Sequence, residues 1–151
     1  MKHRQKGVAI VEFALILPLL LLLTFFTTEF GRAIWEYNTL TKSVRDGARY
    51  LSTQQPGSAA AITTARNLMV YGSYTNTGTP LAIGLTPAKV PDPTWQLVAS
   101  TAVNGSAPLI NTVTVRISGY QFNSMFTSVF GLPFGAITFP DIQATMRSNL
   151  T

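Results

Sequence analysis

The sequence contains no cysteine and only one histidine. The absence of cysteine excludes disulfides, thiolate nucleophiles and thiolate metal sites. The single histidine, His3, lies near the N-terminus, so no serine–histidine pair or histidine metal site is expected in the rest of the chain. No phosphate-binding loop, dinucleotide fingerprint or paired-carboxylate motif occurs either. We therefore expect that the protein is not an enzyme and binds no cofactor, metal or small-molecule substrate.

Charged residues are also scarce, at 11% of the 151 residues against 46% hydrophobic residues. Soluble globular proteins have roughly 25% charged residues, so this composition indicates a membrane protein. The net charge of +5 is concentrated at the N-terminus, where Lys2, Arg4 and Lys6 precede the first apolar residues. No dense basic patch follows, and we expect no nucleic-acid partner.

Residues 8–26 are apolar except for Glu12, Pro18 and Thr24. This length matches the roughly 20 residues that a helix needs to cross a bilayer. Basic residues precede the run and Glu29 follows it, which predicts a cytoplasmic N-terminus and an exported C-terminal part. We expect a basic leader at 1–7, a transmembrane helix at 8–28 and an exported domain at 29–151.

The apolar run does not end like a secretory signal peptide. It is followed by Thr27, Thr28, Glu29 and Phe30, with no small-residue cleavage site. Retention of the segment is favoured, while a secreted domain released by cleavage near Thr28 is a third hypothesis.

The helical pattern continues beyond the apolar run. One stripe recurs at spacings of three and four residues, namely Phe30, Ile34, Tyr37, Leu40, Val44, Ala48 and Leu51. The opposite face is expected to pair Arg32 with Glu36 and Lys42 with Asp46. The pattern predicts an unbroken helix over 8–52 that ends before Pro56 and Gly57.

The remainder predicts a second, short helix and a small antiparallel sheet. Residues 59–71 form the helix, with Ser58 as its N-cap and Gly72 at its end. A surface loop is expected at 72–93. Three strands are expected at 95–103, 111–122 and 137–147, with a bend at Gly119 and a short helical turn at 125–130. The fold class is therefore α+β.

Glu12 is the most informative residue of the apolar run. A carboxyl group inside a membrane helix costs several kcal/mol unless it is neutral, reaches the interface or has a partner. Glu12 lies only four residues after Val8, so the cytoplasmic interface and a functional partner both remain open as explanations.

The sequence Lys6-Gly7-Val8-Ala9-Ile10-Val11-Glu12-Phe13 resembles a prepilin peptidase site. The wider likeness is to TadE-like proteins. It is carried by Val11-Glu12-Phe13-Ala14-Leu15, Leu17-Pro18, Glu29-Phe30-Gly31-Arg32 and Arg45-Asp46-Gly47-Ala48-Arg49-Tyr50. A looser likeness lies in Thr112-Val113-Thr114-Val115-Arg116 and Ala144-Thr145-Met146-Arg147.

The resemblance implies a pilin-like minor pilin or pseudopilin of the Tad (Flp) pilus in a bacterial inner membrane, with a role in surface adhesion and biofilm formation. It places cleavage between Gly7 and Val8 and assigns Glu12, Phe13 and Pro18 to subunit assembly. The implied partners are a prepilin peptidase, other pilin-like subunits and the Tad assembly machinery, beside the lipid bilayer.

Three small residues of the long helix, Gly31, Gly47 and Ala48, are interpreted as sites of close helix packing. Arg45, Asp46 and Arg49 are expected on a solvated face. Trp35 and Tyr37 are candidates for the lipid headgroup region, and Trp95 for the core. Asp92 and Asp141 each adjoin a proline and are interpreted as isolated turn residues.

Two main hypotheses remain. The first is a TadE-like minor pseudopilin whose leader is removed. The second is an unprocessed, signal-anchored envelope protein whose exported domain binds a partner protein or the cell wall. Removal of the leader distinguishes them.

Overall fold

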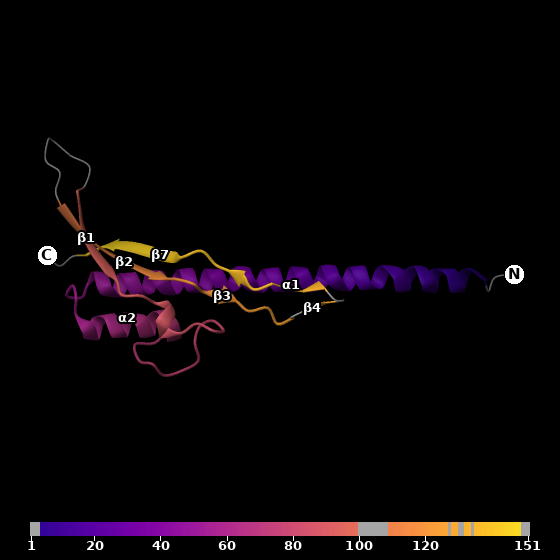
Figure 1. Cartoon of the computed structure of the whole chain (residues 1–151), viewed down its shortest axis with the longest axis horizontal. Helices are drawn as coiled ribbons and strands as arrows, with labels where there is room; N and C mark the ends of the chain where they lie inside the picture. The colour runs from indigo at the N-terminus through magenta and orange to yellow at the C-terminus, as the bar shows by residue number, and fades with distance from the viewer. Residues whose placement is uncertain (1–3, 100–108, 127, 130–131, 134, 149–151) are drawn as a thin grey trace. The chain divides into compact units, whose positions relative to one another are not determined.

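A computed structural model describes residues 4–99, 109–126, 128–129, 132–133 and 135–148 (Figure 1). The described residues form two α-helices, α1 (Arg4–Ser52) and α2 (Ala59–Tyr71), and one 3-10 turn, η1 (Pro87–Lys89). The longer strands are β1 (Thr94–Ala99), β2 (Leu109–Ile117) and β7 (Ile142–Arg147). The two-residue strands are β3 (Gln121–Phe122), β4 (Ser128–Val129), β5 (Leu132–Pro133) and β6 (Ile137–Thr138). The predicted α+β fold is confirmed.

The chain forms two compact units, and α1 contributes to both. The first unit combines Met1–Trp35 with Ser124–Gly135, and the second combines Glu36–Asn123 with Ala136–Thr151. The predicted unbroken helix is present, although it begins at Arg4, before the predicted start at residue 8. Pro18 lies inside it, in the apolar part.

In the second unit, α2 has the two caps expected from its sequence. The Ser58 side chain accepts a hydrogen bond from the backbone N–H of Ala61, and Gly72 adopts a left-handed conformation with φ 68°. The Gly72 N–H donates to the carbonyl oxygen of Leu68 at 3.0 Å. These caps satisfy backbone groups that the helix ends leave without intrahelical partners, which fixes the length of α2.

A three-stranded antiparallel sheet has the order β1-β2-β7. In β2 the side chains of Val113, Val115 and Ile117 are buried, as their alternation predicts, while Arg116 is exposed. The strand expected over 111–122 ends at Ile117, because Gly119 takes φ 62° and redirects the chain into β3. The part of the strand expected over 95–103 that follows Ala99 lies outside the described residues.

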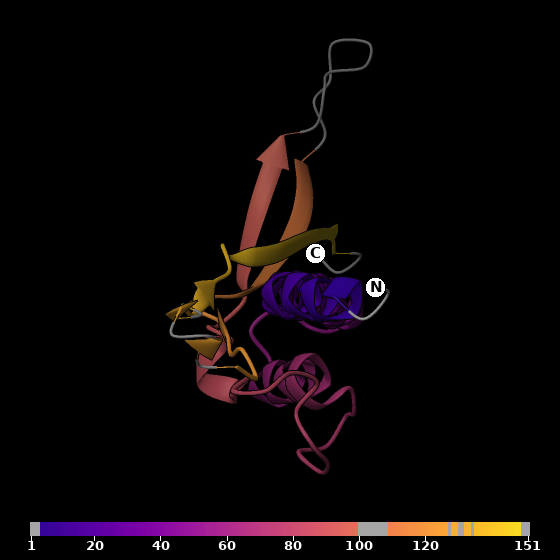
Figure 2. The same ribbon diagram turned by 90° about the vertical axis from the view of Figure 1, so that its right-hand side faces the viewer.

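The core of the second unit lies between the sheet and α2, with the C-terminal part of α1 in the middle (Figures 1 and 2). Leu40, Val44, Ala48 and Leu51 of α1 are buried there, as the predicted stripe requires. The earlier members of the stripe differ, because Phe30 and Ile34 are 65% and 48% exposed. The stripe is therefore a core-forming face only from Leu40 onward.

The side chain of Glu36 is buried, which contradicts its predicted place on an exposed face. The Tyr120 hydroxyl donates to the Glu36 carboxylate and also lies 2.9 Å from the carbonyl oxygen of Ile83. Around them, Phe139 packs against both Tyr120 and Phe122, at ring-centroid distances of 5.6 and 6.2 Å. A polar contact thus ties α1 to the chain after Gly119 inside an aromatic cluster.

The segment 72–93 is only partly the surface loop that was predicted. Ala82, Leu85 and Val90 are buried, and the N–H of Leu81 donates to the carbonyl oxygen of Val70 at 2.8 Å. Apolar residues at irregular spacings pack into the core here without regular secondary structure.

Two other expectations are wrong. The helical turn expected over 125–130 is replaced by β4, which pairs with β5 in an antiparallel hairpin. The strand expected over 137–147 is divided into β6 and β7, separated by Phe139, Pro140 and Asp141. Proline has no N–H to donate to a sheet, which accounts for the interruption.

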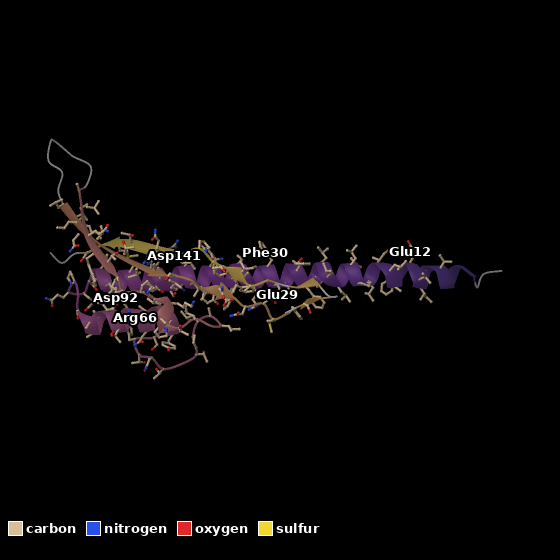
Figure 3. The ribbon with its side chains drawn as sticks, viewed as in Figure 1. Glu12, Glu29, Phe30, Arg66, Asp92 and Asp141 are labelled. Carbon is tan, nitrogen blue, oxygen red and sulfur yellow. The ribbon has the colours of Figure 1, made fainter. Side chains whose placement is uncertain are left out.

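The two acids interpreted as isolated are both paired. Asp92 lies 2.8 Å from the guanidinium of Arg66, and Asp141 lies 3.9 Å from that of Arg116 (Figure 3). Arg45, Asp46 and Arg49 are exposed, as expected. Trp95 is half-buried, although its indole Nε1 has no hydrogen-bond partner among the described residues.

Candidate membrane and assembly segment

The N-terminal part of α1 is long and apolar enough to cross a membrane, and its most apolar window is not buried by any described part of the chain. Large apolar side chains are exposed along its length, among them Val8 at 69%, Leu15 at 75% and Leu23 at 62%. Such a surface is unfavourable in water and suits a hydrocarbon environment.

The polar side chain of Thr24 has a hydrogen-bond partner within the helix, in contrast to that of Glu12. The Thr24 hydroxyl donates to the carbonyl oxygen of Leu20 at 2.8 Å. Thr27 and Thr28 bond the carbonyl oxygens of Leu23 and Thr24 in the same way. These threonines therefore carry no unsatisfied hydroxyl donor into an apolar layer.

Glu12 is exposed and makes no hydrogen bond or ion pair to any residue that the structure describes. It projects from α1 (Figure 3) and lines an open depression with Gly7, Val8, Val11 and Leu15. Val8 and Glu12 thus share one side of the helix, as their spacing of four residues requires. Within the part of the chain that the structure describes, Glu12 therefore has no partner.

The other predicted assembly residues also lie on open helix surface. Phe13 is 60% exposed, and Pro18 is exposed in the apolar part of α1. A side chain added at Gly7 would meet nothing within 4 Å. The structure brings these residues together only as neighbours along one helix.

A polar cluster follows the apolar run directly. Glu29 is 6% exposed, and its carboxylate lies 3.2 Å from the guanidinium of Arg32 (Figure 3). Burial on its own would raise the pKa of Glu29. Hydrogen bonds from Arg32, the Ser124 side chain and the Met125 N–H, together with the Arg32 charge, outweigh burial and lower that pKa below its ordinary value.

The loop at Ser124 completes this cluster and packs on the apolar run. The Ser124 Oγ accepts a hydrogen bond from the Phe126 N–H at 3.1 Å and lies 2.8 Å from the Phe126 carbonyl oxygen. The Phe126 ring lies 5.0 Å from that of Phe25. From the sequence, Glu29 was used as a flanking charge and as part of the Glu29-Phe30-Gly31-Arg32 likeness, and its pairing with Arg32 was not predicted. The sequence did contain a signal for this ion pair, namely an arginine three residues after an acid at the end of an apolar run.

The three small residues of α1 differ in their surroundings. At Gly47 an added Cβ would lie 2.6 Å from the Met69 Cγ, so the glycine permits close contact between α1 and α2. Ala48 is fully buried beside it. At Gly31 an added Cβ would meet nothing within 4 Å.

The aromatic residues proposed for the headgroup region also differ. Trp35 is 65% exposed. Tyr37 is 39% exposed and packs edge-on against Phe139, with ring centroids 5.4 Å apart. Tyr37 therefore contributes to the folded body of the second unit.

Comparison with protein families finds a match for the N-terminal part of the chain. Residues 7–49 match the family described as TadE-like protein, with the match starting at Gly7 and ending three residues before the end of α1. This segment is similar to TadE-like proteins. The TadE-like segment contains the apolar run, Glu12, the Glu29–Arg32 pair and Gly47. No curated protein and no solved structure matches the chain.

Among the described residues, no group of three or more histidine, cysteine, aspartate or glutamate side chains is placed to hold a metal ion. The features of the TadE-like segment are a membrane-length apolar surface, the carboxyl of Glu12 without a partner among the described residues, and the Glu29–Arg32 charge pair at the end of the run.

Proposed function

We propose that this protein is a minor pilin or pseudopilin of a Tad (Flp) pilus assembly, acting in pilus biogenesis and surface adhesion. It spans the bacterial inner membrane once, with a cytoplasmic N-terminus and an exported C-terminal domain. Its role is structural rather than enzymatic. The proposal is supported by the TadE-like match over residues 7–49 and by an apolar helix surface that the described chain leaves uncovered.

The observation that carries the proposal is that Glu12 has no partner among the described residues. It is an exposed carboxyl with no partner among the described residues, on a helix otherwise suited to lipid. A charge left in that environment costs several kcal/mol. In a bundle of such helices, the new amino terminus of one subunit can pair with Glu12 of a neighbour, which removes this cost and fixes the axial register.

Processing between Gly7 and Val8 would create that amino terminus. Both residues lie in the N-terminal part of α1, and Gly7 has low helix propensity. A prepilin peptidase therefore needs to unwind helix at a residue that supports it weakly to reach the bond.

Phe13 and Pro18 are proposed to contact other pilin-like subunits. Both lie on the uncovered surface of the helix, and Pro18 withholds one backbone N–H from the helical ladder. A neighbouring helix in a subunit bundle covers such a surface by close packing. Gly31, with open space around it, suits the same contact.

The test is intact mass and N-terminal sequencing of the membrane-extracted protein, produced with and without a prepilin peptidase. A mature start at Val8 that requires the peptidase supports the proposal. The matched control is Gly7→Leu, which should leave the leader attached without changing membrane insertion. A start upstream of Gly7 in the presence of active peptidase contradicts it.

A signal-anchored envelope protein is the second candidate, and one observation favours it. Helix α1 begins at Arg4 and runs through Gly7 without interruption, so leader and membrane helix form a single element. Such a protein would keep its N-terminus and use its exported domain to bind a partner protein or the cell wall. The same sequencing experiment separates the two candidates.

A further inference from the structure

The C-terminal part of α1 carries a row of basic side chains on its exposed face. Lys42, Arg45 and Arg49 are spaced by three and four residues, so they lie along one face of the helix. All three are exposed, and none makes a hydrogen bond or ion pair with another described residue. These three residues form the basic row.

The positive charge of the basic row is not balanced by the second unit, to which it belongs. This unit contains seven basic and four acidic residues. Asp92 and Asp141 are each paired with an arginine outside the row, and Glu36 is buried. Asp46 is the remaining acid, and the ion pair that the sequence predicts between it and Lys42 is not formed. Three cations therefore face solvent with one carboxylate beside them.

A groove adjoins the basic row. It has a volume of about 300 Å³ and is lined by Lys42 and Asp46 of α1 on one side. Leu68 of α2 and Leu81, both half-buried, provide apolar lining. Because Lys42 belongs to both features, one ligand can contact the basic row and the groove together.

The two features together select the chemistry of the ligand. Guanidinium groups bind carboxylates through paired N–H···O bonds, and carboxylates spaced three and four residues apart on a helix match the spacing of the row. An aliphatic side chain of the same segment suits the apolar lining of the groove.

An anionic lipid surface fits the basic row less well. Basic clusters that bind lipid contain about four to eight Lys or Arg residues immediately next to a membrane helix. The basic row has three, and Lys42 comes sixteen residues after the end of the apolar run at Phe26. The observations therefore favour a protein ligand.

We propose that the basic row and its groove form a docking site for an acidic helical segment of a partner protein. Carboxylates of that segment pair with Lys42, Arg45 and Arg49, and one aliphatic side chain enters the groove. The inference requires only the folded second unit. It stands or falls independently of leader removal, which tests the proposed function.

The probe is a fluorescent synthetic peptide of about 20 residues, long enough to form a helix in water. It carries three glutamates at the spacings of the basic row and one leucine beside them. One matched peptide has glutamine in place of each glutamate, and another has alanine in place of the leucine. Binding to the full chain in non-ionic detergent is measured by fluorescence anisotropy at low ionic strength, where charge pairs are least screened.

A carbodiimide, which joins an amine to a carboxylate, then locates the contact. Apart from Lys2 and Lys6, the sequence contains only two lysines, Lys42 and Lys89. Mass spectrometry of the linked product therefore distinguishes the basic row from the rest of the chain.

The glutamate peptide should bind and should be joined to Lys42. Arg45→Gln and Arg49→Gln should each weaken its binding about two- to fivefold, as expected for the loss of one exposed ion pair. Arg147→Gln removes an exposed base from β7 and is the matched control, which should leave the affinity unchanged. The alanine peptide should bind more weakly than the leucine peptide.

Any of four results overturns the inference. Equal binding of the glutamate and glutamine peptides would show that charge does not select the ligand. Linkage at another lysine, or an equal loss for Arg147→Gln and Arg45→Gln, would show attraction to the net charge of the chain without a site. Equal binding of the leucine and alanine peptides would remove the groove from the site. Displacement of the peptide by phosphatidylglycerol in the micelles, as effective as by unlabelled peptide, would assign the basic row to anionic lipid.

Discussion

The carboxylate of Glu29 lies 3.2 Å from the guanidinium of Arg32, one turn further along α1 and directly after the apolar run. The pair is largely removed from solvent, since the Glu29 side chain is 7% and the Arg32 side chain 22% exposed. It also binds the loop at Ser124 through the Glu29 carboxylate. A charge pair thus joins the end of the apolar run to a segment distant in sequence.

The first prediction concerns the loss of folding stability at low pH. The pKa of Glu29 is lower in the folded protein than its ordinary value of 4.5. The ionised Glu29 side chain therefore contributes its full stabilisation above pH 4.5. This stabilisation is lost as the pH falls through the lowered pKa that Glu29 has in the folded protein. In detergent, urea unfolding should show wild type losing more stability in acid than Glu29→Gln.

The control for this prediction is Asp46→Asn, which removes an exposed carboxyl from the same helix. It should leave the acid sensitivity of the wild type in place. Equal slopes of stability against pH for wild type and Glu29→Gln would contradict the assignment of the folded-state pKa shift to Glu29.

A second prediction compares two glycines of α1. Gly47→Ala adds a methyl group 2.6 Å from the Met69 Cγ, inside a core where Met69 is 1% exposed. Overpacking costs about 1–3 kcal/mol and outweighs the gain of about 1 kcal/mol in helix propensity. Gly31→Ala meets no atom within 4 Å and should be neutral or stabilising by up to about 1 kcal/mol.

Denaturant titration of detergent-solubilised variants measures both effects. Met69→Ala creates a cavity and is itself destabilising, but combined with Gly47→Ala it should cost less than the sum of the two single losses, which shows coupling between the two positions. If Gly47→Ala is as stable as Gly31→Ala, the contact between α1 and α2 is looser than the structure indicates.

The sequence predicts some features of the fold correctly and others incorrectly. The correct predictions concern features that neighbouring residues decide. The caps of α2 depend on Ser58 and Gly72 acting on neighbouring backbone, so both could be recognised from the sequence. Burial of Val113, Val115 and Ile117 followed from their alternation in one strand. Each feature is decided within a few residues.

Three of the incorrect predictions concern contacts between distant segments. The β4 strand exists through pairing with β5, which nothing in its own composition reveals. Asp92 has its partner Arg66 26 residues earlier. Glu36 is buried because Tyr120 reaches it from the far side of Gly119. For Glu12 and Pro18 the sequence predicts a role in subunit assembly, and it stays a prediction because no contact within the described residues bears on it.

A third prediction separates the two bonds of Arg66. The Arg66 Nε donates to the carbonyl oxygen of Val90 at 3.1 Å, whereas its contact at 2.8 Å is to Asp92, whose side chain is 80% exposed. An exposed ion pair contributes about 0–1 kcal/mol, so Asp92→Asn should cost less than about 1 kcal/mol. Arg66→Ala also frees the partly buried Val90 carbonyl and should cost about 1–3 kcal/mol.

Salt provides the check on this prediction. Raising the ionic strength should erase the cost of Asp92→Asn and leave most of the cost of Arg66→Ala, because screening acts on the ion pair and not on the bond to Val90. Equal costs for the two variants at low salt would show that the ion pair, rather than the carbonyl bond, fixes the segment before β1.

The last prediction concerns Glu12, whose carboxyl makes no bond within the described chain. Glu12→Ala should therefore leave the unfolding free energy and helix content unchanged within about 0.5 kcal/mol, as is usual for substitutions without intramolecular contacts. If Glu12 pairs with the amino terminus of a neighbouring subunit, the variant should be processed normally at Gly7 but fail to crosslink to other pilin-like subunits in the membrane. Leu15→Ala, at a 75% exposed position one turn away, is the matched control for loss of side-chain bulk and should crosslink like wild type. Wild-type crosslinking by Glu12→Ala would place the carboxyl in the interfacial water and remove it from the assembly contact.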